Sequence, residues 1–210
     1  MILYHGTHIQ GIKTLKPFST PQNAISKSVI CFTPCPYIAL FYIWNRSYKW
    51  VTFNADENNK VVFTENYEGM LYDFYHNVSG SLYECNGDNP TIIQTHMKGV
   101  FTSDAPVEIE KETVIPNVYD EILKQEALEN IIVKRYSQLS SEEKAHILKK
   151  TIIAIHRQKL LFPTEHQPTI AQIEFVKSHF PEAWSIASQM TKPEIDKMVN
   201  EWKAYLESKR

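Results

Sequence analysis

The N-terminus of the chain carries three residues that could bind a polar ligand together. His5, Gly6 and Thr7 follow the apolar run 1–4. Glycine lets a ligand approach the main chain, where the amide and carbonyl groups can pair with a carboxamide, and imidazole and hydroxyl groups can hydrogen-bond to sugar hydroxyls. The same tripeptide could instead end a strand and begin a turn, a common use of glycine. A ligand site here therefore needs support from other residues.

Three later segments carry aromatic and small residues in an order that matters for this site. The run 30–33 is Ile-Cys-Phe-Thr, the run 39–42 is Ala-Leu-Phe-Tyr, and the run 101–107 contains Ser-Asp-Ala-Pro-Val. Together with the His-Gly-Thr tripeptide, these segments resemble the motifs of the ADP-ribosyltransferase fold, which includes the poly(ADP-ribose) polymerases and the bacterial rifampin-type transferases. The resemblance covers residues 1–115 and no residue beyond them.

This resemblance implies a cleft that binds NAD as a substrate and transfers ADP-ribose to a protein or small-molecule acceptor. His5 would contact the adenosine-side ribose, the main chain of Gly6 would contact the nicotinamide carboxamide, and Thr7 would complete the motif. Cleavage of the glycosidic bond passes through an oxocarbenium-like transition state, which a nearby carboxylate stabilises.

The stacking aromatic residue departs from the family pattern. Cys31 stands where a tyrosine is expected, and a thiol cannot stack on a pyridine ring. The resemblance then implies that Tyr37 or Tyr42 stacks on the nicotinamide instead. We expect His5 and Tyr42 to face a common cleft, because the order strand, turn, helix brings them close.

The acidic residue departs from the pattern as well. Val100 stands where the acid is expected. Glu84 is the first replacement candidate for the catalytic carboxylate, and Asp88 and Asp104 are further candidates. Each of these carboxylates could equally be a solvated strand edge or loop cap.

These departures leave several functions open. The protein could be a weakly active transferase, or a catalytically inactive relative that binds a nucleotide or a protein partner. It could also be an adaptor that makes its contacts through the C-terminal half. A thiol–imidazole pair of Cys31 with His5 is a further alternative. The remaining histidines show no spacing typical of a metal site.

The composition and charge of the chain limit the classes of partner that it is expected to bind. The chain has 210 residues, of which 43% are hydrophobic, and its formal charge is −2 with 22 basic and 24 acidic residues. Such a balance creates no long-range field for nucleic acid or for an anionic membrane. The three cysteines lack zinc-type spacing, and there is no apolar run of about 20 residues that could span a membrane. We therefore expect a cytoplasmic protein with reduced thiols and no membrane or nucleic-acid partner.

The elements that must position these residues fall in two regions. Residues 1–116 should form an ADP-ribosyltransferase-like α+β domain, a mixed or antiparallel split sheet with one or two helices, because β-branched and aromatic runs alternate with turn residues. The segment 49–64 should form a hairpin around a polar loop at 55–59. Strands are expected at 2–5, 28–33, 49–54, 60–64, 80–85, 91–96 and 99–103, and helices are expected from Pro36 to Trp44 and at 65–76.

Residues 117–210 should form an all-helical region packed on the first. Ser140 with Glu143 and Thr191 with Glu194 have the spacing of capping boxes, which mark the beginnings of helices. The helices are expected at 117–128, 141–160, 169–179, 181–189 and 192–208.

Overall fold

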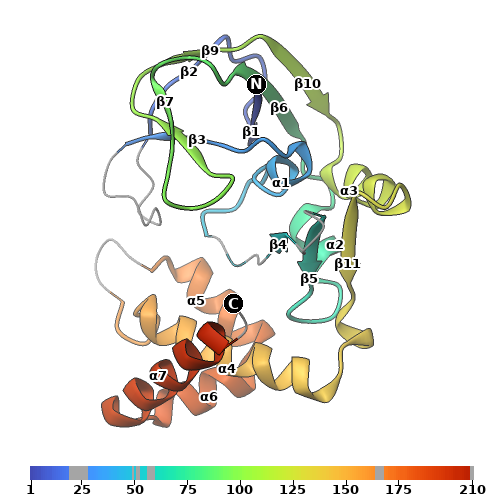
Figure 1. Ribbon diagram of the computed structural model, residues 1–210. Helices are drawn as coiled ribbons and strands as arrows, with labels where there is room; N and C mark the ends of the chain where they lie inside the picture. Colours follow the sequence, from blue (N-terminus) through green and yellow to red (C-terminus); the bar gives the residue numbers. More distant parts are fainter. Residues whose placement is uncertain (19–27, 49, 51–52, 56–59, 164–167, 209–210) are drawn as a thin grey trace. The chain divides into compact units, whose positions relative to one another are not determined.

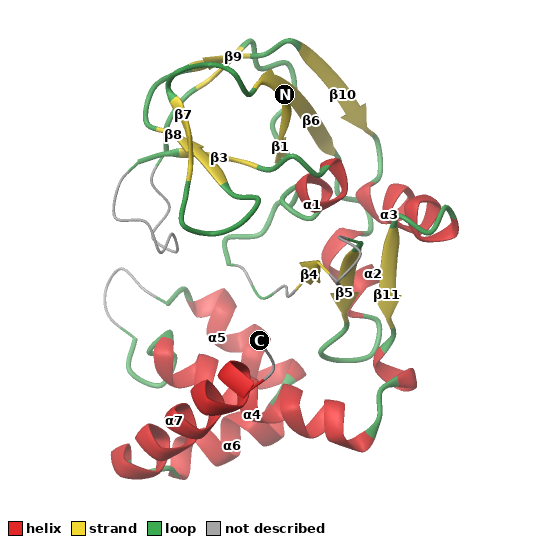
Figure 2. Cartoon of the chain, viewed as in Figure 1, coloured by secondary structure: helices red, strands yellow, loops and turns green. Residues whose placement is uncertain are grey.

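The computed structural model describes residues 1–18, 28–48, 50, 53–55, 60–163 and 168–208. The chain divides into two compact units. Unit 1 comprises Met1–Glu65 and Gly69–Lys134, and unit 2 comprises Asn66–Glu68 and Arg135–Arg210. Every described strand belongs to unit 1, and helices make up most of unit 2 (Figures 1 and 2). The candidate site residues all lie in unit 1.

Unit 1 has an α+β fold, as the sequence indicates. Its helices are α1 (Pro36–Leu40), α2 (Met70–Tyr75) and α3 (Val118–Ala127). Its strands are β1 (Ile2–Thr7), β2 (Thr14–Leu15), β3 (Ile30–Phe32), β4 (Phe53–Ala55), β5 (Val61–Thr64), β6 (Gly80–Asn86), β7 (Ile92–Gln94), β8 (Phe101–Ser103), β9 (Val107–Glu108), β10 (Lys111–Ile115) and β11 (Ile131–Lys134).

Two antiparallel three-stranded sheets meet at a single bridge. One has the order β1-β6-β10 and the other has the order β3-β8-β7. Tyr4 in β1 and Thr33, just after β3, join them through an isolated antiparallel bridge. The result is a split sheet, in which β1 and β3 lie next to each other but pair at one position only. The predicted split sheet is thus confirmed.

The predicted hairpin at 49–64 is confirmed for its strands. β4 pairs antiparallel with β5, and residues 56–59 of the loop expected at 55–59 lie outside the described residues. On its other edge β5 pairs in parallel with β11, which makes this third sheet mixed. The β11 strand lies in the region that was expected to be wholly helical. Its run of Ile131, Ile132 and Val133 explains why it is extended, since β-branched residues favour strands.

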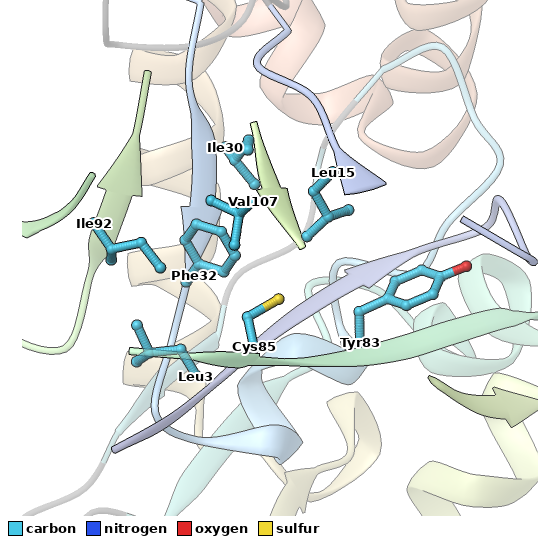
Figure 3. Packing of buried hydrophobic residues seen from close by; sticks show 8 residues of the cluster. All are labelled: Leu3, Leu15, Ile30, Phe32, Tyr83, Cys85, Ile92 and Val107. Atoms are coloured by element: carbon cyan, nitrogen blue, oxygen red, sulfur yellow. The ribbon is translucent and has the colours of Figure 1, made fainter. Parts of the chain in front are cut away.

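The hydrophobic core of unit 1 has two parts. One part lies among the sheets, where side chains of β1, β3 and β6 point toward one another and toward β2 and β9, as Figure 3 shows. Its members are Leu3, Leu15, Ile30, Phe32, Tyr83, Cys85, Ile92 and Val107. The other part is aromatic: Phe41 lies parallel to Phe63 at 5.3 Å between ring centroids, and the Tyr75 hydroxyl donates to the Phe41 carbonyl at 3.0 Å.

Helix α1 is shorter than expected. Pro36 occupies its first turn, where a missing N–H costs nothing, and the helix ends at Leu40. The next amides bond three residues back, for example Tyr42 N–H to the Ala39 carbonyl at 3.1 Å, which tightens the last turn. Residues 42–44 are therefore not helical, and Tyr42 is 42% exposed rather than buried.

Unit 2 is built from α4 (Ser141–Arg157), α5 (Ile170–His179), α6 (Pro181–Gln189) and α7 (Lys192–Ser208). These bounds confirm the predicted helices. The capping box of Ser140 and Glu143 is present, with both reciprocal hydrogen bonds, at 2.9 and 3.1 Å. At α7 the Glu194 carboxylate accepts from the Thr191 main-chain N–H at 2.8 Å.

The division between the units differs from the sequence-based boundary after Pro116. Helix α3 and strand β11 belong to unit 1, because α3 packs on α1 and α2 and β11 pairs with β5. In addition, the short segment Asn66–Glu68 belongs to unit 2, where the Tyr67 ring lies 4.4 Å from the ring of His179. The chain therefore passes between the units more than once.

Candidate functional site

The junction of β1 and β3 is the place where the predicted ligand-binding residues gather. Tyr4 N–H donates to the Thr33 carbonyl at 2.8 Å, and Thr33 N–H donates to the Tyr4 carbonyl at 3.0 Å. A regular antiparallel ladder would next pair Gly6 with Cys31. Instead, the Cys31 carbonyl accepts from His5 Nδ1 at 2.9 Å. A side chain thus occupies the position of a main-chain hydrogen bond, and the ladder stops there.

The hydrogen bond to the Cys31 carbonyl fixes the position of one proton on the His5 ring. A carbonyl oxygen only accepts, so Nδ1 carries the proton and Nε2 of the neutral ring is an acceptor. Burial lowers the pKa of His5, while the Cys31 carbonyl opposes that effect in part. The ring also makes edge contacts with Phe32 and Phe18, at 6.1 and 6.5 Å between centroids. Within the described part of the chain Nε2 has no hydrogen-bond partner.

Gly6 packs tightly against α1 on one side, and its main-chain N–H and C=O groups point toward β3 on another. A Cβ atom added at Gly6 would lie 1.9 Å from the Ala39 carbonyl oxygen in α1, so the glycine is required for this helix to reach the strand. Because Tyr4 directs its amide and carbonyl toward β3, Gly6 two residues later does the same. Neither group of Gly6 is hydrogen-bonded to any residue that the structure describes.

The sheet β1-β6-β10 has two faces that separate the predicted residues. The His5 face carries His5, Tyr83 and Glu112, which are register partners across the three strands. The Gly6 face carries Gly6 and Glu84, since successive residues of a strand point to opposite sides. Helix α1 packs on the Gly6 face. The prediction that His5 and Tyr42 share one cleft is therefore wrong, because Tyr42 follows α1 on the opposite side.

Tyr42 nevertheless lies near the junction. Partial burial raises the pKa of the Tyr42 phenol, and the nearby Cys31 thiol adds to the effect. The Tyr42 ring contacts Trp44 and Phe53, at 6.1 and 5.6 Å between centroids. Cys31 is thus approached by His5 through its carbonyl from one side and by Tyr42 through its thiol from the other. The hydrogen bond of His5 therefore joins the imidazole to the Cys31 carbonyl and not to the thiol.

Thr7 and Tyr37 have simpler surroundings. The Thr7 hydroxyl oxygen accepts from Ile9 N–H at 3.3 Å and so helps to turn the chain at the end of β1. Tyr37, in the first turn of α1, is half-buried and has no ring or hydrogen-bond contact within the described residues. Its ring remains available to a ligand, whereas the Thr7 oxygen already serves a turn.

Glu84 is not placed with His5. It lies on the Gly6 face, where its Oε1 is 2.7 Å from Lys111 Nζ, and its side chain is 20% exposed. The other carboxylate candidates lie elsewhere: Asp88 pairs with the amino group of Met1 at 3.2 Å, and Asp104 follows β8. The structure therefore brings His5 and Gly6 to the junction but separates them from the predicted acid.

Glu112 is a carboxylate that the sequence did not single out. Its Oε1 accepts from Gly11 N–H at 2.8 Å and from the Ser81 hydroxyl at 2.7 Å, and it lies 3.0 Å from the Tyr83 hydroxyl. These hydrogen bonds, that from Gly11 first, lower the pKa of Glu112. The sequence does not reveal Glu112, because the polar start of β10 is not typical of a strand. The face of the sheet on which Glu112 lies follows only from the strand register.

No group of metal-ligating side chains is present among the described residues, and none of the described helices is long and apolar enough to cross a membrane. None of Cys31, Cys35 and Cys85 is in a disulfide, and burial raises the pKa of Cys85 to about 12, which disfavours its thiolate. Comparison with known proteins gives no further guidance, since no family model, no curated protein and no solved structure matches this chain.

Proposed function

We propose that unit 1 is an ADP-ribosyltransferase-like module that binds NAD, or a related nicotinamide nucleotide, at the junction of β1 and β3. The observation that carries this proposal is the main chain of Gly6, whose N–H and C=O groups point toward β3 without a partner among the described residues. A primary carboxamide has one acceptor and one donor side by side. It can therefore pair with both groups of Gly6 at once, in the manner of a neighbouring strand.

His5 supports the same ligand. Its neutral ring presents Nε2 as an acceptor, and a ribose hydroxyl is a matching donor. A ligand bound in the junction would meet His5 from one side of the sheet and the Tyr42 region from the other. The nicotinamide ring would then lie beside an aromatic side chain without requiring the single cleft that the sequence predicted.

The surroundings of Glu84, the candidate catalytic carboxylate, favour slow transfer of ADP-ribose. Transfer of ADP-ribose requires stabilisation of an oxocarbenium-like centre, and a carboxylate does this best when no cation already neutralises it. Glu84 is paired with Lys111 at 2.7 Å on the face opposite His5. This ion pair favours the alternative in which the module binds a nucleotide or a protein partner, with little or no transfer to an acceptor. We accordingly propose micromolar or weaker binding of NAD.

The test compares ligands that differ only at the carboxamide. NAD is titrated against nicotinic acid adenine dinucleotide by calorimetry. The acid form has two acceptors and would repel the Gly6 carbonyl, so we expect its affinity to fall by about tenfold or more, since an unsatisfied buried group costs roughly 1–3 kcal/mol. Equal affinity for the two ligands would exclude recognition by Gly6.

Two variants complete the test. His5→Ala should weaken NAD binding by a similar factor, because it removes the acceptor for the ribose hydroxyl. His8→Ala is the matched control, since His8 is exposed and lies three residues along the same chain. Release of nicotinamide is measured in parallel. Rapid release that depends on Glu84 would show an active enzyme and reject the slow-transfer proposal, and absence of NAD binding to the unmodified protein would reject the nucleotide site.

A further inference from the structure

The loop between β1 and β2, residues 8–13, is held mainly by hydrogen bonds. His8, Ile9, Gln10 and Gly11 are exposed, and Ile12 is partly buried. Apolar packing of this stretch is confined to Ile12, which lies against the hydrophobic cluster of unit 1. The loop follows directly after the His5–Thr7 strand end, so whatever fixes the loop also fixes one border of the candidate site.

The groups that hydrogen-bond to the loop belong to β6 and β10. Gly11 N–H donates to Glu112 Oε1 at 2.8 Å, and Ile12 N–H donates to the Tyr83 hydroxyl at 3.1 Å. The Tyr83 hydroxyl oxygen also lies 3.0 Å from the Ile9 carbonyl. Gln10 Nε2 adds a bond to the Gly80 carbonyl at 3.3 Å. Gly11 itself has φ of 72°, a conformation that favours glycine.

Glu112 is the centre of this arrangement. A single oxygen, Oε1, receives Gly11 N–H and the Ser81 hydroxyl and lies within 3.0 Å of the Tyr83 hydroxyl. Hydrogen bonds to an ionised acceptor are roughly twice as strong as those between neutral groups. The lowered pKa of Glu112 agrees with this, because the folded protein favours the charged form.

The fastening lies on the same side of the sheet as His5. His5 is the register partner of Tyr83, and Tyr83 is the register partner of Glu112. Side chains directly opposite one another share a face of the sheet. The loop is therefore tied down over the face on which His5 presents Nε2.

We propose that Glu112 is a positioning residue for the His5 side of the ligand site, acting through the β1–β2 loop. Glu112 orders the loop, and the loop borders the ribose that His5 holds. The carboxamide end, recognised by the main chain of Gly6, does not depend on Glu112. This inference rests on the proposed function, because it assigns a role toward the same nucleotide.

The first experiment measures the loop without any ligand. Hydrogen exchange of the Gly11 and Ile12 amides is followed in the wild type and in Glu112→Gln, which keeps the shape and an acceptor but removes the charge. We expect exchange at both amides to accelerate about tenfold, given the strength lost with the charge. Glu108→Gln is the matched control, since Glu108 accepts one bond, from Thr14, at 2.8 Å on the neighbouring strand. Unchanged protection of Gly11 would overturn the role of Glu112 as the fastening residue.

The second experiment separates positioning from general damage. Affinities for NAD and for free nicotinamide are measured in the wild type, Glu112→Gln and Glu108→Gln. We expect Glu112→Gln to weaken NAD binding about five- to tenfold and to leave nicotinamide binding unchanged, while Glu108→Gln changes neither. Equal weakening of both ligands would overturn the proposal, because it would indicate loss of the whole fold around the site.

The two failures can be told apart. If the wild type binds neither NAD nor nicotinamide, the proposed function is rejected. The positioning role of Glu112 toward a nucleotide is then rejected too, even if amide exchange in the loop accelerates as expected. If the wild type binds NAD and Glu112→Gln loosens the loop without changing the affinity, the nucleotide site stands and the positioning role of Glu112 is rejected.

Discussion

The two faces of the β1-β6-β10 sheet hold their carboxylates in contrasting ways. On the His5 face, neutral donors from the loop and from β6 surround one oxygen of Glu112. On the Gly6 face, Glu84 meets the single, largely exposed cation of Lys111. An exposed ion pair contributes little, since solvent competes for both charges. Hydrogen bonds from neutral donors lower the pKa of Glu112 more than the charge of Lys13 does, and the sequence alone does not distinguish this case from that of Glu84.

The largest effect is expected on the Gly6 face, from Gly6→Ala. The new Cβ would meet the Ala39 carbonyl oxygen at 1.9 Å, and main-chain atoms cannot move aside as a side chain can. We expect a loss of about 3 kcal/mol or more in the free energy of unfolding, measured by urea denaturation. Gly11→Ala is the control: it has open space but a φ of 72°, so it should cost only about 1–2 kcal/mol. A smaller loss for Gly6→Ala than for Gly11→Ala would contradict close packing of α1 on β1.

A medium effect is expected from the buried tyrosines. Tyr83→Phe removes a hydroxyl that serves Ile12 N–H, the Ile9 carbonyl and Glu112, and should destabilise the protein by about 2–3 kcal/mol. Tyr75→Phe removes a hydroxyl with one carbonyl partner, Phe41, and should cost about 1 kcal/mol. Thermal unfolding of the two variants checks the order. Equal losses would show that the loop contacts on the His5 face add nothing to stability.

A smaller effect is expected from acid. The pKa of Glu112 is lowered by folding, so its contribution to stability is present above the unfolded value of 4.5 and is lost as the pH falls through the folded pKa. Glu112→Gln should therefore be less stable than the wild type at neutral pH and should converge with it in acid. Glu84→Gln should differ little from the wild type at neutral pH. Parallel pH profiles of wild type and Glu112→Gln would remove the basis for the contrast between the faces.

The smallest effect concerns His5. Burial lowers its pKa, so the unfolded chain binds more protons just below pH 6.5 and stability declines as the pH falls from 6.5 toward the folded pKa. His5→Gln removes this titration and should flatten the profile in that window. His156, whose pKa is also lowered by burial, retains its own share, so His156→Gln gives the matched comparison. An unchanged slope in His5→Gln would mean that His5 is equally protonated in both states.

The sequence predicts the helices of unit 2 with their bounds because local signals mark them. Pro181 begins α6, and the pair Thr191 and Glu194 begins α7. It also predicts β1, although this strand continues past the expected range 2–5 and ends at Thr7. What it does not give is register. Glu84 and Tyr83 are neighbours in the chain, yet pairing sends them to opposite faces, and only the pairing reveals that Glu112 shares a face with His5.

Two of the strands in unit 1 that were not expected from the sequence show the same limit. β10 begins with Lys111 and Glu112, whose polarity conceals a strand at the edge of a sheet. β11 is apolar, but its parallel partner β5 lies about 70 residues earlier, between Val61 and Thr64, and no local pattern reports so distant a pairing.

The hydrogen bond from His5 to the Cys31 carbonyl has a consequence for how the sheet is kept open. Adjacent antiparallel strands whose main-chain groups lack partners tend to form further ladder hydrogen bonds. With a valine or isoleucine at position 5, no side chain would prevent Gly6 from pairing with Cys31. The His5 imidazole donates to the Cys31 carbonyl, which then no longer needs the Gly6 amide as a partner. One side chain thereby prevents the two strands from pairing further along the ladder.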